Sequence, residues 1–191
     1  TAGAGILHEE FHSPAFTYQG GHLEMIQLWV NLPAADKMAP PSYQAITGEQ
    51  IPVVPLAAAN GEIRVITGEF QGHAGPAKTF SPMLVWDVTL QDHANVLLDV
   101  PDGWNTAVIA RSGSSLINEH ARAAVGQMVV LSSQGNQVQI QTEAESQLLL
   151  ISGEPLNEPI EGYGPFVMNT KEEIRQAIRD FQQGDFGKMS S

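Results

Sequence analysis

A series of short apolar segments between residues 61 and 151 constrains the fold more than any other feature of this sequence. Seven such segments follow one another at spacings of about ten residues, and Gly, Asn, Asp and Ser are frequent between them. This spacing predicts the short strands of a β-sandwich or antiparallel barrel, because a parallel α/β sheet needs longer helical connections. The segments are Ile63–Thr67, Met83–Leu90, Val96–Val100, Thr106–Ala110, Gln127–Leu131, Gln137–Gln141 and Gln147–Ile151.

Apolar side chains recur at every second position in several of these segments. On a strand, residues two apart point to the same side of the sheet, so such a row forms one buried face. The residues predicted in this way to form the core are Leu84, Trp86, Val88 and Leu90 on one strand, and Leu98 and Val100 on another.

A similar alternation occurs nearer the N-terminus, in Glu24–Leu32, and predicts a further strand that Pro33 ends. Its apolar face would consist of Ile26, Leu28, Val30 and Leu32. Prolines then cluster between residues 33 and 55, which predicts a crossover or linker without regular structure. They are Pro33, Pro40, Pro41, Pro52 and Pro55.

One segment near the C-terminus is helical in character. Thr170 and Glu173 have the spacing of a capping box, in which each side chain bonds the backbone N–H of the other, and Gly184 is a typical helix end. Apolar residues recur between them at spacings of three and four. These residues, Ile174, Ala177, Ile178 and Phe181, predict one amphipathic helix of about four turns.

Composition limits the classes of function. Hydrophobic residues make up 42% of the 191 residues, which excludes a disordered chain, and no apolar run is long enough to span a membrane. The net charge of −12 argues against direct binding to nucleic acid, whose phosphates require cationic partners. The absence of Cys excludes disulfides and thiolate metal sites, and is compatible with the cytoplasmic location that we expect.

His8 and Glu10 are the residues that most suggest chemistry. If the segment is a strand, the two side chains point to the same side and converge on one point. Nitrogen and oxygen donors of this kind suit Fe(II), Mn(II) or Zn(II), although a stable site needs at least one further ligand. The alternative interpretation is a polar strand end at the surface.

The remaining histidines have no metal-binding spacing, since neither His-x-His nor His-Glu-x-x-His occurs. His12 joins the face of His8 and Glu10 only if the strand extends that far. We expect the others to be hydrogen-bonded or solvated, and Tyr43 to pack against its surroundings. Phosphate-binding loops and a Gly-x-Ser-x-Gly motif are lacking, so nucleotide and hydrolase functions have no support. The five histidines are His12, His22, His73, His93 and His120.

Unbroken runs of residues over nearly the whole chain resemble the pirin family of bicupin proteins. The opening Thr1–Glu10 is similar to the segment that closes the first cupin barrel in that family. The most specific runs are Leu28-Trp-Val-Asn-Leu-Pro33 followed by Lys37-Met38, Pro40-Pro41 and Tyr43-Gln44, and near the end Gly153–Pro159 and Tyr163–Thr170.

The resemblance implies an all-β fold of two cupin-type double-stranded β-helix barrels with one C-terminal α-helix. Residues 1–45 would be the C-terminal remnant of the first, metal-binding barrel, residues 46–168 the second barrel, and residues 169–191 the helix and tail. Because the chain starts inside the implied first barrel, we expect upstream sequence to be missing. The exposed edge of that incomplete barrel would favour self-association.

The resemblance also implies one mononuclear metal, usually iron, bound by three histidines and one glutamate in the first barrel. His8 and Glu10 match the second half of that ligand set, and the first half, a His-x-His on an earlier strand, lies outside this sequence. We therefore expect Fe(II) in the full-length parent and an incomplete site in this chain. The second barrel, with no replacement set of His and Glu, is expected to bind no metal.

Three functions follow from the resemblance. The first is an oxygenase like quercetin 2,3-dioxygenase, acting on a flavonol-like substrate, in which Glu10 is both a metal ligand and the base that takes the hydroxyl proton. The second is a redox-sensitive regulator that binds transcription factors or metabolic enzymes without catalysis, to which an acidic surface is suited. The third is an inert fragment. This chain alone is expected to be inactive.

Overall fold

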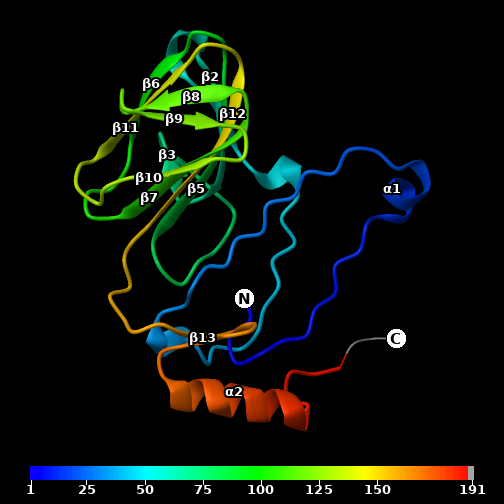
Figure 1. The fold of residues 1–191 in the computed structure, drawn as a ribbon. Coiled ribbons are helices and arrows are strands. Elements are labelled where there is room, and N and C mark those ends of the chain that lie inside the picture. The colour runs from blue at the N-terminus through cyan, green and yellow to red at the C-terminus, as the bar shows by residue number, and fades with distance from the viewer. Residues whose placement is uncertain (189–191) are drawn as a thin grey trace. The chain divides into compact units, whose positions relative to one another are not determined.

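The structure is a computed structural model that describes residues 1–188 (Figure 1). The chain forms two compact units, which we describe separately. One is Gln44–Leu156, and the other combines Thr1–Tyr43 with the segment from Asn157 onward. These boundaries come from contacts within each unit. The division into barrels at residues 45 and 168 stays a prediction.

The unit Gln44–Leu156 contains two antiparallel sheets (Figure 1). The six-stranded sheet has the order β1-β2-β5-β12-β7-β10, formed by β1 (Val53–Pro55), β2 (Gly61–Thr67), β5 (Met83–Leu90), β12 (Ser146–Gly153), β7 (Asn105–Ser112) and β10 (Met128–Val130). The four-stranded sheet has the order β6-β11-β8-β9, formed by β6 (Asn95–Asp99), β11 (Gln137–Thr142), β8 (Ser114–Ile117) and β9 (Ala121–Ala124). A short hairpin joins β3 (Glu69–Phe70) to β4 (His73–Ala74).

Strand β12 organises the larger sheet, because it pairs with β5 along its whole length and with β7 on its other edge. All seven segments predicted as strands are strands, within one or two residues at their ends. Strands β8 and β9 were missed, since Ser114–Ile117 is too short and too rich in Ser to show an alternating pattern. Asn118 and Glu119 in the turn between them both have positive φ, as tight hairpin turns require.

The core of this unit is the apolar row predicted from β5, together with residues from the facing sheet. Trp86 is 2% exposed, and its ring packs edge-on against Phe70 at a centroid distance of 5.1 Å. The six residues predicted to be core are all buried. Besides Trp86, the largest fully buried residues of this core are Ile63, Leu90, Leu98, Ile117, Ile140, Leu148 and Leu150.

In the unit that contains the N-terminus, residues 1–43 form no strand. The strand predicted over Glu24–Leu32 is therefore wrong, because this segment lies in no strand or sheet. Alternation specifies which faces a strand would bury, whereas a strand exists only where a second strand accepts its hydrogen bonds. A short helix, α1 (Pro14–Gln19), was not predicted, and its N-cap is Ser13, whose hydroxyl accepts from Phe16 N–H.

The segment from Asn157 onward forms a hairpin, β13 (Glu161–Tyr163) with β14 (Phe166–Met168), followed by α2 (Lys171–Gln183). The predicted capping box is confirmed. Thr170 Oγ1 accepts from Glu173 N–H at 3.2 Å, and Glu173 Oε2 accepts from Thr170 N–H at 2.7 Å. Gly184 ends the helix in the left-handed conformation. Three short 3₁₀ turns also occur, at Ala34–Asp36, Gly48–Gln50 and Ala57–Ala59.

The fold class is thus confirmed as all-β with a C-terminal α-helix. The described residues contain one double-sheet unit, so the expected two-barrel architecture is supported only for its second barrel. Among residues 1–188 there is no helix with the length and apolar character needed to cross a membrane.

Candidate metal site

The structure brings His8 and Glu10 together. His8 Nδ1 lies 3.9 Å from Glu10 Oε1, and the two side chains are 65% and 60% exposed. The segment is not a strand, so the alternation expected to align the two side chains is not what places them.

Hydrogen bonds hold the segment that leads to this pair. Ala4 N–H donates to the carbonyl of Ala39 at 2.9 Å, and the amino group of Thr1 donates to the carbonyl of Ser42 at 2.7 Å. Closer to the pair, Leu7 N–H donates to the carbonyl of Phe186 at 3.3 Å. The residues just before His8 are therefore attached to two other parts of the same unit.

The donor set fits part of a metal site. Imidazole nitrogen and carboxylate oxygen are ligands of Fe(II), Mn(II) and Zn(II). Neighbouring donors that each stand about 2.1 Å from one ion are about 3.0 Å apart in an octahedral site and about 3.4 Å apart in a tetrahedral one, so the two side chains, at 3.9 Å, would have to move closer together to bind one ion as neighbours. The described residues contain no group of three or more potential ligands, so His8 and Glu10 can supply only two positions of a coordination sphere.

The other histidines do not complete this set within residues 1–188. His12 stacks at an angle on Phe16 with ring centroids 5.3 Å apart, and His73 Nδ1 lies 3.2 Å from the carbonyl of Gln71. His93 has positive φ in the turn after β5. Tyr43 is 89% exposed, so the expectation that it packs is wrong.

A polar cluster around Lys37, in the same unit as His8, was missed by sequence reasoning. Lys37 is only 5% exposed, and its Nζ donates to Asn31 Oδ1 at 2.6 Å. Burial lowers the pKa of Lys37 below its ordinary value of 10.5, while the carboxylates of Glu158 and Glu173 act in the opposite direction. No local signal could have revealed this site, because lysines are mostly exposed and the two glutamates are remote in sequence.

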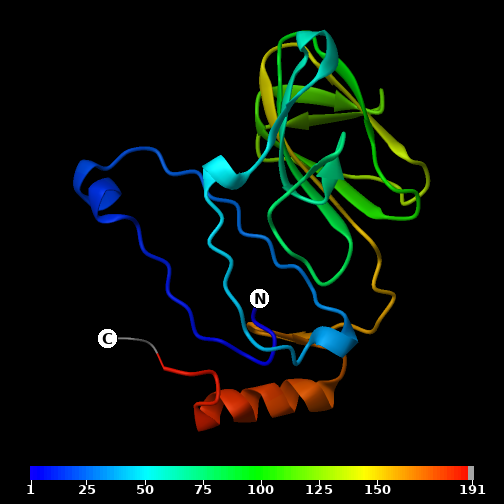
Figure 2. The same ribbon diagram turned by 180° about the vertical axis from the view of Figure 1, so that it is seen from behind.

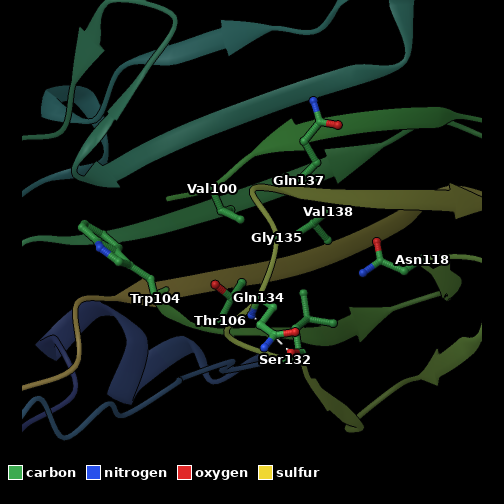
Figure 3. A pocket seen from close by; sticks show the side chains of 10 residues that line it. Val100, Trp104, Thr106, Asn118, Ser132, Gln134, Gly135, Gln137 and Val138 are labelled. Atoms are coloured by element: carbon green, nitrogen blue, oxygen red, sulfur yellow. Dashed lines mark hydrogen bonds between the residues drawn. The ribbon is translucent and has the colours of Figure 1, made fainter. Parts of the chain in front are cut away.

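The double-sheet unit has a small cavity at one end (Figure 3). Its volume is about 70 Å³, room for roughly two water molecules. Thr106 and Trp104 line it, with the loop Ser132–Gly135 crossing the opening in Figure 3. Every polar side chain around it is a neutral amide, hydroxyl or indole, so this cavity offers no imidazole or carboxylate to a metal ion.

Comparison with known proteins identifies the family. The Pirin C-terminal cupin domain matches residues 85–187, which are more than half of the chain. The chain belongs to the pirin family. The match covers strands from β5 onward, the β13–β14 hairpin and α2.

The pirin relatives include proteins that are named for an enzyme activity. A crystal structure of quercetin 2,3-dioxygenase from Acinetobacter baumannii matches with a TM-score of 0.95 and 48% identity, covering 100% of this chain and 66% of that one. A Pseudomonas aeruginosa protein named "Putative quercetin 2,3-dioxygenase" is 49% identical over 97% of this chain and 65% of its own length. Human pirin is 36% identical over 98% of this chain and 63% of its own. The chain thus spans slightly less than two thirds of these relatives.

Proposed function

We propose that this chain carries two of the ligands of a mononuclear Fe(II) oxygenase site of the quercetin 2,3-dioxygenase type. The observation that carries the proposal is the approach of His8 Nδ1 to within 3.9 Å of Glu10 Oε1 in a chain whose relatives bear that enzyme name. The remaining ligands would come from the part of the relatives' length that this chain does not match.

The exposure of the pair is consistent with an accessible site. Iron bound there would supply a place where a flavonol's adjacent oxygens and dioxygen meet. His8 would act only as a ligand. Glu10, a carboxylate at the same point, would both ligate and accept the substrate's hydroxyl proton, since a general base must lie within hydrogen-bond reach of that proton.

Oxygen uptake tests this function. The full-length protein, reconstituted with Fe(II) under anaerobic conditions, is supplied with quercetin and oxygen, and the wild type is compared with His8→Ala and Glu10→Gln. We expect both variants to lose at least 100-fold in kcat/KM, the scale on which a general base or a metal ligand contributes. His22→Ala is the matched control, because His22 is an exposed histidine in the same unit. Turnover by His8→Ala at the wild-type rate would contradict the proposal.

A second candidate is a protein-binding role that responds to the oxidation state of the metal. The net charge of −12 favours protein contacts over DNA contacts. Affinity purification with and without oxidant tests this role, and identical partners under both conditions would contradict a redox switch.

A further inference from the structure

Phe186, which follows α2, lies directly against the segment that leads to His8 and Glu10. The course of the chain just after α2 can be followed in Figure 2. Leu7, the residue before His8, donates its backbone N–H to the carbonyl of Phe186. The side chain of Phe186 contacts Gly5, which is two residues before Leu7. The ring lies so close to Gly5 that a Cβ added there would stand 2.2 Å from a ring carbon. Phe186 thus contacts the segment through both its backbone and its side chain.

Two other phenylalanines support Phe186. Phe166 in β14 and Phe181 in α2 pack edge-on against it, with ring centroids 6.1 and 5.8 Å away, and against each other at 6.3 Å. Aromatic pairs prefer this edge-to-face geometry at such distances. We call Phe166, Phe181 and Phe186 the aromatic clamp.

The turn at the end of α2 determines the position of Phe186. Gly184 has a φ of 86°, and its N–H bonds to the carbonyls of Asp180 and Phe181. Asp185 N–H also bonds to the carbonyl of Asp180, at 3.0 Å. These bonds reverse the chain after α2 in the manner of a helix C-cap, so Phe186 returns onto Phe181.

The clamp is the nearest anchor to the ligand pair along the backbone. After Leu7, the next backbone hydrogen bond in the described chain is that of Thr17 N–H to Ser13, in α1. His8 therefore follows an anchored residue immediately, whereas the residues from His8 to His12 lie in no helix or strand. Without the contacts of Phe186 to Gly5 and Leu7, the nearest backbone hydrogen bond to a segment remote in sequence would be that of Ala4 N–H to Ala39, four residues before His8.

We propose that Phe186, seated against Gly5 and supported by Phe166 and Phe181, is a positioning residue that holds His8 and Glu10 in the arrangement that binds the metal. This inference rests on the proposed metal site. A pair that is already ordered loses less conformational freedom on binding an ion than a pair on a mobile segment. Groups that orient metal ligands typically contribute a factor of about 10 to 100 in affinity, which is the effect we expect here.

The experiment uses the full-length protein and two measurements. One is the Fe(II) dissociation constant, obtained anaerobically by competition with a chelator. The other is the exchange rate of the Leu7 amide proton in the metal-free protein, which reports the hydrogen bond to Phe186 whether or not metal binds. The variants are Phe186→Ala and Gly5→Ala. Gly5→Ala disrupts the same contact at its other partner, because the new methyl group collides with the Phe186 ring. Gly5 also has a φ of 129°, a conformation that strains any residue with a side chain.

We expect Phe186→Ala and Gly5→Ala to accelerate Leu7 exchange and to weaken Fe(II) binding by about 10- to 100-fold. Phe186→Tyr, which keeps the ring, should restore both quantities to near the wild-type values. Phe11→Ala is the matched control, because Phe11 lies on the other side of the ligand pair and its side chain is 83% exposed. Far-UV circular dichroism of each variant shows whether the fold is retained.

Faster Leu7 exchange with unchanged Fe(II) affinity would overturn the positioning role and leave the metal site intact. If the Leu7 amide of Phe186→Ala exchanges at the wild-type rate, the positioning role also fails, because the Phe186 ring would then not order the segment before His8. If His8→Ala binds Fe(II) as tightly as the wild type, the proposed metal site itself fails, and the positioning role with it. Equal weakening by Phe11→Ala would show that any truncation in the segment has the effect, which also contradicts a specific role for Phe186.

Discussion

Two segments of this chain have the same alternation of apolar residues and different outcomes. Met83–Leu90 is β5, in the middle of a six-stranded sheet, and its apolar face is buried. Glu24–Leu32 lies in no strand, and its Leu28, Trp29 and Val30 are 40%, 66% and 50% exposed. The difference shows that alternation predicts which face a strand can bury, while neighbouring strands decide whether the strand forms.

The largest difference in the free energy of unfolding is expected between variants of one tryptophan from each segment, Trp86 and Trp29. Trp86→Ala removes a fully enclosed indole and should lower the free energy of unfolding by about 3–5 kcal/mol. Trp29→Ala removes an exposed one and should change it by less than about 0.5 kcal/mol. Urea titrations followed by far-UV circular dichroism measure both. Similar losses in the two variants would mean that residues 24–32 are packed as tightly as β5.

Ion pairs give a second contrast. Asp87 in β5 is 15% exposed at its side chain and pairs with Arg64 at 3.1 Å and with Arg111. Asp87→Asn removes the negative charge that pairs with Arg64 and with Arg111, and we expect the free energy of unfolding to fall by about 2 kcal/mol, between the values for buried and exposed pairs. The exposed His8–Glu10 pair should contribute almost nothing to stability, so His8→Gln serves as the comparison. A loss below about 0.5 kcal/mol for Asp87→Asn would contradict this interpretation of the buried pair.

The helices α1 and α2 also differ in how much they bury. Thr170 caps α2, which buries Ile174, whereas Ser13 caps α1, which has no buried residue. Thr170→Ala should lower the free energy of unfolding by about 1 kcal/mol, the usual value of an N-cap, and Ser13→Ala should lower it too little to detect because α1 buries no residue. Thermal unfolding of both variants checks the ranking, and equal shifts in Tm would contradict it.

The smallest expected effect is the pH dependence that Lys37 gives to the free energy of unfolding. Since the pKa of Lys37 is lower in the folded chain than its ordinary value of 10.5, the unfolded chain binds more protons between the two values. The stability of the wild type relative to Lys37→Met should therefore increase as the pH rises toward 10.5. The groups that face Lys37 are Asn31, Glu158 and Glu173.

Urea titrations at several pH values measure this difference for Lys37→Met. Lys171→Met, at an exposed position at the start of α2, is the control. If the stability of the wild type relative to Lys37→Met decreases as the pH rises, attraction to Glu158 and Glu173 outweighs the cost of burying Lys37.

Most strands of the double-sheet unit and the C-terminal helix could be predicted from the sequence alone. Strands such as Met83–Leu90 and the capping box of Thr170 and Glu173 are specified by residues a few positions apart, so their patterns can be recognised locally. The choice of His8 and Glu10 as candidates also came from the sequence, through a spacing of two residues. Their role as metal ligands stays a prediction.

The surroundings of the candidate site become visible only in the folded chain. Phe186 and Gly5 lie at opposite ends of the chain, and Lys37 is buried by residues that are equally remote in sequence. Contacts of this kind arise from the path of the whole backbone, and no short pattern encodes them. The same reason explains the wrong strand at Glu24–Leu32, because the pairing that a strand needs is a property of its neighbours in space.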